Sequence, residues 1–187
     1  RLLSRGLGDV YKRQGTYSRT ISTDNAQAQA FFDQGLRLAW GFYFPESIAS
    51  YQEASRLDPT HPMPYWGMAH AMGPNPNSRY ARMPDDPKGE GLKAIKNAMD
   101  RIDRASALEA KLIRALFVLY DKEAIADPDA RDQAYLAAMR ALNKAYPDDS
   151  DIAALYAASY MSIGRWDYWD SNGNPRAETL QVAEALE

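Results

Sequence analysis

The stretch Ala28–His61, AQAFFDQGLRLAWGFYFPESIASYQEASRLDPTH, decides the fold. Apolar residues recur along it at the three- and four-residue spacing of amphipathic helices, and almost nothing in the chain alternates as a strand does. Gly41 interrupts the pattern, and Pro45 suits the first turn of a helix because its missing N–H is not needed there. The sequence therefore predicts one helix that ends at Trp40 and a second that begins at Pro45.

The same helical pattern continues beyond this stretch. Its connections contain Pro and Gly, as in GPNPN at Gly73–Asn77, which cannot continue a helix. We therefore expect about eight helices in four successive pairs. Their expected ranges are roughly 23–40, 45–57, 62–72, 88–102, 106–120, 130–145, 150–163 and 176–187.

Particular positions of Ala28–His61 match one tetratricopeptide repeat, which is about 34 residues long. The matching residues are Phe31, Gly35, Ser47, Tyr51, Ala54 and Pro59, and the next helix continues in register with Tyr65 and Ala69. Gln34 departs from the Leu that is usual there, and Ser47 from Ala. With MPYWGMAHAMGPNPN, YPDDSDIAALYAASYM and RWDYWDSNGNP, the stretch resembles a bacterial family of tetratricopeptide-repeat proteins. The resemblance implies an all-α, right-handed α-solenoid, and it implies no reaction.

The two ends of the chain differ from this pattern. Ser4–Gln14, SRGLGDVYKRQ, resembles the translation of an adapter used in transposase-based sequencing libraries, and it lacks the apolar run of a signal peptide. We expect residues 1–14 to be a disordered artefact and residues 15–187 to form one helical repeat domain. We also expect that the natural start is missing and that Glu187 ends a fragment. Localisation, cytoplasmic or periplasmic, therefore stays open.

The composition excludes several classes of function. The chain has no cysteine, so it has no thiolate nucleophile, disulfide or Cys-based zinc site. Its net charge is -3, and it has no cluster of Lys and Arg to neutralise a phosphate backbone. No stretch approaches the roughly 20 apolar residues of a membrane span. We expect no nucleic-acid partner, no membrane span and no cofactor.

The first helices of the pairs are expected to line the concave face of the solenoid. Where the register is clear, this face is aromatic and mildly polar, which suits a bound peptide or helix. A neighbouring segment that already fills the groove is the alternative. The candidate groove residues are Gln29, Phe32, Leu36, Trp40, Met63, Trp66 and His70.

Long connections at about 73–87, 121–129 and 164–175 are expected to share one rim of the solenoid, where function often lies. Two of them are rich in aromatic, Asn and charged residues. In the alternative, the tryptophans fold back over the edge of the solenoid and the Asn and Asp residues form turns. The candidate rim residues are Asn75, Asn77, Arg79, Tyr80, Trp166, Asp167, Trp169, Asp170 and Asn172.

No catalytic or metal-binding motif emerges from the remaining residues. We expect His61 to be solvated in a turn, and His70 to lack an orienting carboxylate on its own helix. Asp170, Asn172 and Gly173 alternate as in a calcium loop, but the first and last ligand positions do not match, so a turn explains them better. The sequence favours a scaffold that binds a protein or peptide. The alternative is a small-molecule or enzymatic site on the rim that includes His70.

Overall fold

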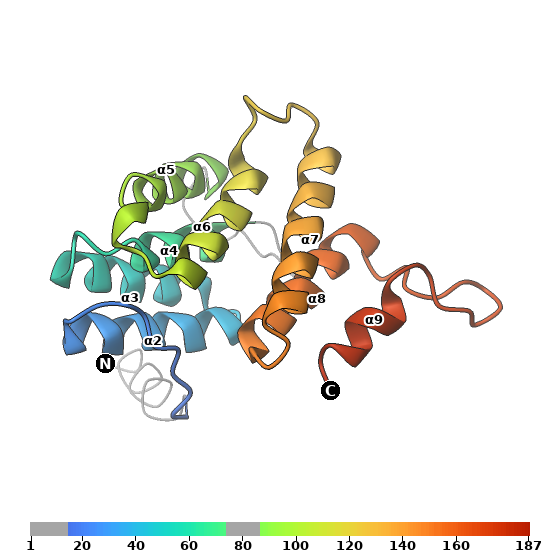
Figure 1. The fold of residues 1–187 in the computed structure, drawn as a ribbon, viewed down its shortest axis with the longest axis horizontal. Helices are drawn as coiled ribbons and strands as arrows, with labels where there is room; N and C mark the ends of the chain where they lie inside the picture. The colour runs from blue at the N-terminus through green and yellow to red at the C-terminus, as the bar shows by residue number, and fades with distance from the viewer. Residues whose placement is uncertain (1–14, 74–86) are drawn as a thin grey trace, which may run out of the picture.

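A computed structural model describes residues 15–73 and 87–187 of the chain. Over these residues the protein is all-helical and contains no strand, only one isolated bridge between Trp169 and Pro175. The helices agree closely with the predicted ranges, except that the last is shorter and begins later (Figure 1). They are α2 Ala26–Trp40, α3 Phe44–Leu57, α4 Met63–Met72, α5 Pro87–Met99, α6 Ala107–Tyr120, α7 Pro128–Ala145, α8 Ser150–Gly164 and α9 Thr179–Glu184, with a 3-10 turn at Ile102–Arg104.

Side-chain caps fix where several helices begin. Asn25 caps α2 by accepting the N–H groups of Gln27 and Ala28 on its side-chain oxygen. The predicted start of this helix at residue 23 is therefore too early, because Thr23 donates its hydroxyl to Asp58 instead. Asp149 caps α8 by accepting the N–H of Ile152, as carboxylates do at helix N-termini.

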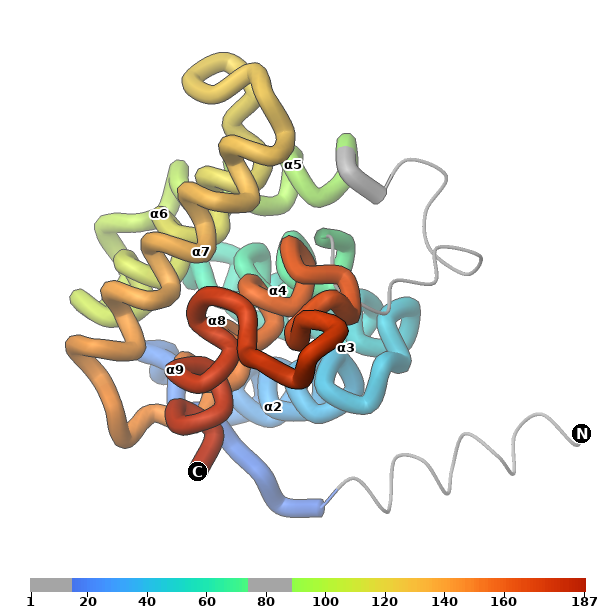
Figure 2. The backbone as a smooth tube through the Cα atoms, turned by 90° about the vertical axis from the view of Figure 1, so that its right-hand side faces the viewer, coloured from blue at the N-terminus to red at the C-terminus, as the bar shows by residue number. Residues whose placement is uncertain are grey.

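Each helix from α2 to α8 packs against the next one in the chain, and α4 also contacts α2 and α6. In Figure 1, α2 to α6 form one stack and α7 and α8 stand at its end. Figure 2 shows α8 between α7 on one side and α2, α3 and α4 on the other. One continuous apolar core therefore runs from Ile21 to Val182.

The closest helix approach surrounds Tyr51 of α3. A Cβ atom on Gly35 would lie 2.7 Å from the Tyr51 ring, and one on Gly67 would lie 2.5 Å from it. The hydroxyl of Ser47 donates to the backbone oxygen of Gly35 over 2.7 Å, so α2 and α3 touch at their backbones. Tyr51 thus fills the space between α2 and α4 that the two glycines leave open.

The extended residues before α2 connect α2 to α8. The guanidinium of Arg19 donates to Asp149 and Asp151 at the start of α8, at 2.8 Å each. Its backbone N–H and the hydroxyl of Ser18 donate to Asp33 of α2. Burial acts to raise the pKa of Asp149, but hydrogen bonds from Arg19 and from α8 hold it below its usual value. The segment therefore joins parts of the fold that lie far apart in sequence.

The residues after α8 form a hairpin, 165–178, that leads into α9. It extends away from the helices in Figure 1 and lies in front of α8 in Figure 2. Glu178 at its end accepts hydrogen bonds from Arg140 of α7 and Tyr156 of α8. These contacts hold the base of the hairpin against the last two long helices. Over the residues that the structure describes, none of the helices combines the length and the apolar character needed to cross a membrane.

Candidate functional site

The predicted groove residues lie inside the fold. Phe32, Leu36, Met63 and Trp66 are at most 3% exposed. The indole N–H of Trp40 donates to Asp151 of α8 over 3.3 Å. These side chains therefore do not line an open groove; Phe32 packs on Tyr51 of α3, and Trp40 contacts α8.

Gln29 has a structural task of its own. Its side-chain oxygen accepts the N–H of Ile21, and its amide N–H groups donate to the backbone oxygen of Arg19 and to Asp33. Its bonds to Ile21 and Arg19 thus hold the segment before α2. Of the predicted groove residues, His70 alone lines the cavity described below.

The predicted rim residues fall into two groups. Asn75, Asn77, Arg79 and Tyr80 lie outside the described residues. Trp166, Asp167, Trp169, Asp170 and Asn172 all belong to the hairpin 165–178. Trp166 is 67% exposed and Trp169 is 52% exposed, so these two rings do not fold back over the helices.

The hairpin is fixed by its own hydrogen bonds. The carboxylate of Asp170 accepts the backbone N–H groups of Asn172 and Asn174 and the side-chain amide of Asn174. Arg176 pairs with Asp167 at 2.9 Å. The oxygens of Asp170 are therefore used within a turn, as expected, and the turn presents the two tryptophans on a defined backbone.

Two successive non-glycine residues at the base of the hairpin adopt left-handed backbone angles. The φ angle is 44° at Arg165 and 76° at Trp166. Such residues cost roughly 1 kcal/mol or more each and persist only where the surroundings enforce them. The exposed Trp166 is thus held in a strained conformation, which is typical of functional surfaces.

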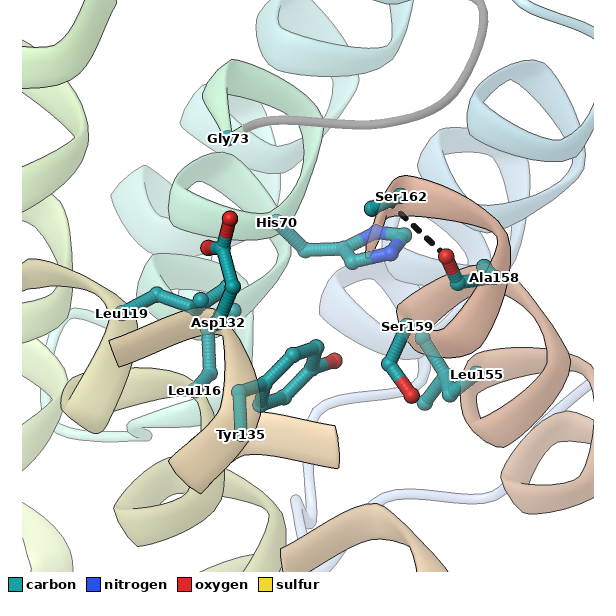
Figure 3. A pocket seen from close by; sticks show the side chains of 10 residues that line it. All are labelled: His70, Gly73, Leu116, Leu119, Asp132, Tyr135, Leu155, Ala158, Ser159 and Ser162. Atoms are coloured by element: carbon teal, nitrogen blue, oxygen red, sulfur yellow. Dashed lines mark hydrogen bonds between the residues drawn. The ribbon is translucent and has the colours of Figure 1, made fainter. Parts of the chain in front are cut away.

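A small cavity lies where α4, α6, α7 and α8 meet (Figure 3). Its volume is about 30 Å³, enough for about two water molecules. Leucines and alanine form its apolar walls, and His70, Tyr135, Ser159 and Ser162 bring polar atoms to it. The lining residues are His70, Gly73, Leu116, Leu119, Asp132, Tyr135, Leu155, Ala158, Ser159 and Ser162.

His70 is held between two tryptophans. Its ring stacks on Trp66 with centroids 5.4 Å apart and an interplanar angle of 3°, and it meets Trp40 edge-on at 5.9 Å. Its Nδ1 atom is enclosed without a hydrogen-bond partner, while part of the ring reaches the cavity. Burial lowers the pKa of His70 to about 4, so the imidazole is neutral at pH 7.

An unpaired buried polar atom of this kind costs about 1–3 kcal/mol. Neither candidate acid from the hairpin meets His70, because Asp167 pairs with Arg176 and Asp170 binds its own turn. Asp132 of α7 is the carboxylate that borders the same cavity. The acidic neighbour of His70 therefore comes from a helix rather than from the rim.

His61 is buried, so its predicted solvation is wrong; 3% of it is exposed. Its Nδ1 accepts the N–H of Met63 over 3.2 Å, and its Nε2 lies 3.1 Å from the hydroxyl of Ser22. That hydroxyl donates to Glu109 of α6, which also accepts the N–H groups of Ser22 and Ser106. We call Ser22, His61 and Glu109 the α6 junction.

The α6 junction is not a nucleophile with its base. Because Nδ1 of His61 accepts from Met63, its proton is on Nε2, which donates to Ser22 and cannot take the serine proton. Burial lowers the pKa of His61. Burial alone would raise the pKa of Glu109, but hydrogen bonds from Ser22 and Ser106 lower it. Every polar group is paired, which makes the junction structural.

Among the described residues, no group of three His, Asp or Glu side chains is placed to hold a metal ion. Comparisons of the chain with protein-family models, with curated proteins and with solved structures return no match. The functional argument therefore depends on the hairpin and on the His70 cavity.

Proposed function

We propose that the protein is a tetratricopeptide-like scaffold that binds a protein or peptide partner, with the hairpin 165–178 as its main contact surface. The observation that carries this proposal is the exposure of Trp166 and Trp169 on a hairpin fixed by internal hydrogen bonds. Tryptophan is enriched among the residues that dominate binding energy at protein interfaces.

Packing around two tyrosines supports the repeat architecture. Tyr51 of α3 fits against Gly35 and Gly67 of the helices on either side of it in sequence. Three helices later, Tyr120 of α6 lies where a Cβ atom on Gly91 of α5 would come within 2.5 Å. Close contacts between glycine and tyrosine thus occur twice along the stack, as expected where the backbones of successive helices approach closely.

The hairpin has the physical properties of a binding element. Its internal bonds fix the backbone before any partner arrives, which reduces the entropy lost on association. The buried groove residues lack this access, so we place the main contact on the hairpin instead. Asp167, Asn172 and Arg176 around the tryptophans supply polar groups for the rim of such an interface.

The proposal can be tested with peptides selected from a random display library on the intact protein. We expect selected peptides to lose at least about tenfold in affinity when Trp166 and Trp169 are both replaced by Ala. The matched control is Phe42→Asn, which removes an aromatic side chain that is 58% exposed at another turn. Its φ angle of 62° suits Asn.

Calorimetry and far-ultraviolet circular dichroism measure affinity and helical content for each variant. Peptides that bind the double variant as tightly as the unaltered protein would contradict the proposal. So would a failure to select any peptide.

A small-molecule site is the second candidate function. The observation that favours it is the neutral, unpaired imidazole of His70 beside a cavity.

A further inference from the structure

We propose that the cavity between α4, α6, α7 and α8 binds one small uncharged molecule that carries a primary amide group. This inference goes beyond the scaffold function and does not rest on it. It is built from the volume of the cavity and from the hydrogen-bonding capacity that its lining residues leave unused (Figure 3).

The first unused group is the hydroxyl of Tyr135. No described residue is recorded as a hydrogen-bond partner of it, and in Figure 3 it points into the space between α7 and α8. Burial raises the pKa of Tyr135, so the hydroxyl stays protonated and needs an acceptor. A ligand in this cavity must therefore offer an oxygen or nitrogen lone pair.

The second unused capacity lies on the other side of the cavity and calls for donors. The hydroxyl protons of Ser159 and Ser162 are used on the backbone oxygens of Tyr156 and Ala158. Their lone pairs remain, and the neutral imidazole of His70 adds one lone pair and one N–H. A ligand must therefore also present N–H or O–H groups, and a primary amide carries the acceptor and the donors on adjacent atoms.

The walls and charges restrict the ligand further. His70 and Tyr135 are both neutral, so neither holds an ion. Asp132, at the edge of the cavity, already has an interaction partner. Leu116, Leu119 and other apolar side chains form the rest of the lining. An uncharged head group with a short hydrocarbon part fits these walls better than a free cation or anion.

The size of the cavity matches a molecule of a few heavy atoms. Space for about two water molecules corresponds to a ligand volume of roughly 60 Å³. Acetamide is a suitable probe, and acetone is its matched control. The two have the same number of heavy atoms and the same shape, but acetone has no hydrogen-bond donor.

The test uses the full chain with isotope-labelled histidine, and follows the imidazole signals of His70 by NMR during titration. We expect acetamide to shift these signals saturably, with a dissociation constant of about 1–10 mM for so small a ligand. Acetone is expected to bind at least about tenfold more weakly, because it satisfies only Tyr135.

A pair of variants separates the hydrogen bond from a general effect of substitution. Tyr135→Phe is expected to weaken acetamide binding about tenfold, the loss expected where a donor is removed. Tyr160→Phe is the matched control: its hydroxyl pairs with Thr179, and it does not line the cavity. That variant should bind acetamide as the unaltered protein does.

Several results would overturn the inference. They are unmoved His70 signals at about 100 mM acetamide, equal affinity for acetone, or a crystal soaked in acetamide whose cavity holds ordered water only. The comparison of acetamide with acetone needs no variant, so it decides the question even if Tyr135→Phe fails to fold. Peptide binding at the hairpin is unaffected by any of these outcomes, so the two proposals can fail separately.

Discussion

The two histidines of this chain lie in opposite kinds of surroundings. His61, in the α6 junction, accepts from a backbone N–H and donates to Ser22, and the serine is bonded in turn to Glu109. His70 stacks between two tryptophans, and neither of its nitrogens has a hydrogen-bond partner among the described residues. One histidine has all its hydrogen bonds and the other has none.

This difference distinguishes a network that only stabilises the fold from a site that can bind a ligand. A fully paired buried network rigidifies a fold and leaves nothing for a ligand to satisfy. An unpaired buried group calls for another explanation, such as bound water or a ligand. The α6 junction joins the segment before α2 to α4 and α6, whereas the His70 cavity keeps donors and acceptors free.

The largest effect is expected from breaking the paired network at its centre. Glu109→Ala leaves the N–H groups of Ser22 and Ser106 without their acceptor and should lower the free energy of unfolding by about 3–4 kcal/mol. Urea denaturation measures this change. Glu123→Ala, at an exposed position after the same helix, should stay within about 0.5 kcal/mol. If both variants lose a similar free energy of unfolding, the hydrogen bonds of the α6 junction do not stabilise the fold more than an exposed position does.

The next effect concerns the pH dependence that His70 adds. Its pKa falls from 6.5 to about 4 on folding, so the unfolded chain takes up the proton first as the pH drops. Stability is therefore complete above about pH 6.5 and decreases toward pH 4. Between pH 7 and 4.5 the unaltered protein should lose about 2 kcal/mol on this account.

The comparison variant is His70→Phe, which keeps an aromatic ring between the tryptophans but does not titrate. Over the same pH interval its free energy of unfolding should decrease by about 2 kcal/mol less than that of the unaltered protein. Glu109, Asp149 and His61 also have lowered pKa values, but they titrate in both proteins, so their contributions cancel in the comparison. Identical declines in the two proteins would disprove the role of His70.

A smaller effect follows from removing one link of the paired network. Ser22→Ala takes the acceptor from His61 but leaves Glu109 bonded to Ser106, so the expected loss is about 1–2 kcal/mol. Ser171→Ala, in the exposed part of the hairpin, is the control and should change stability by less than about 0.5 kcal/mol. If Ser22→Ala lowers the free energy of unfolding by less than about 0.5 kcal/mol, the hydroxyl of Ser22 contributes little to the stability of the α6 junction.

The fold was largely predictable because its signals are local. Helical periodicity and Pro or Gly breaks placed the helices within a few residues, and the close approach expected at Gly35 is present. Asp149 caps α8, as an acidic residue directly before a helix commonly does. The sequence did not predict that Asp149 also pairs with Arg19, which lies 130 positions earlier. No local pattern encodes a contact of that separation.

The sites were predictable only in part, for the same reason. The sequence singled out Trp166, Trp169 and His70, but it assigned His61 to solvent because "DPTH" looks like an exposed turn. Ser22 and Glu109 bury that turn from distant parts of the chain. Nothing in the sequence marked Tyr135 as a site residue, because an aromatic residue on an amphipathic helix usually belongs to the hydrophobic core. The serines at 159 and 162 interrupt an otherwise apolar helix and were the one available hint.

The smallest effect provides the sharpest test of the contrast between the two regions. Tyr135→Phe removes a hydroxyl that has no hydrogen-bond partner among the described residues, so the free energy of unfolding should change by less than about 0.5 kcal/mol or even rise slightly. Tyr160→Phe removes a hydroxyl that pairs with Thr179 at 2.8 Å and should cost about 1 kcal/mol. Thermal and urea unfolding of both variants give the comparison. If Tyr135→Phe costs as much as Tyr160→Phe, the hydroxyl of Tyr135 is already satisfied in the free protein, and the cavity has no unused donor to offer a ligand.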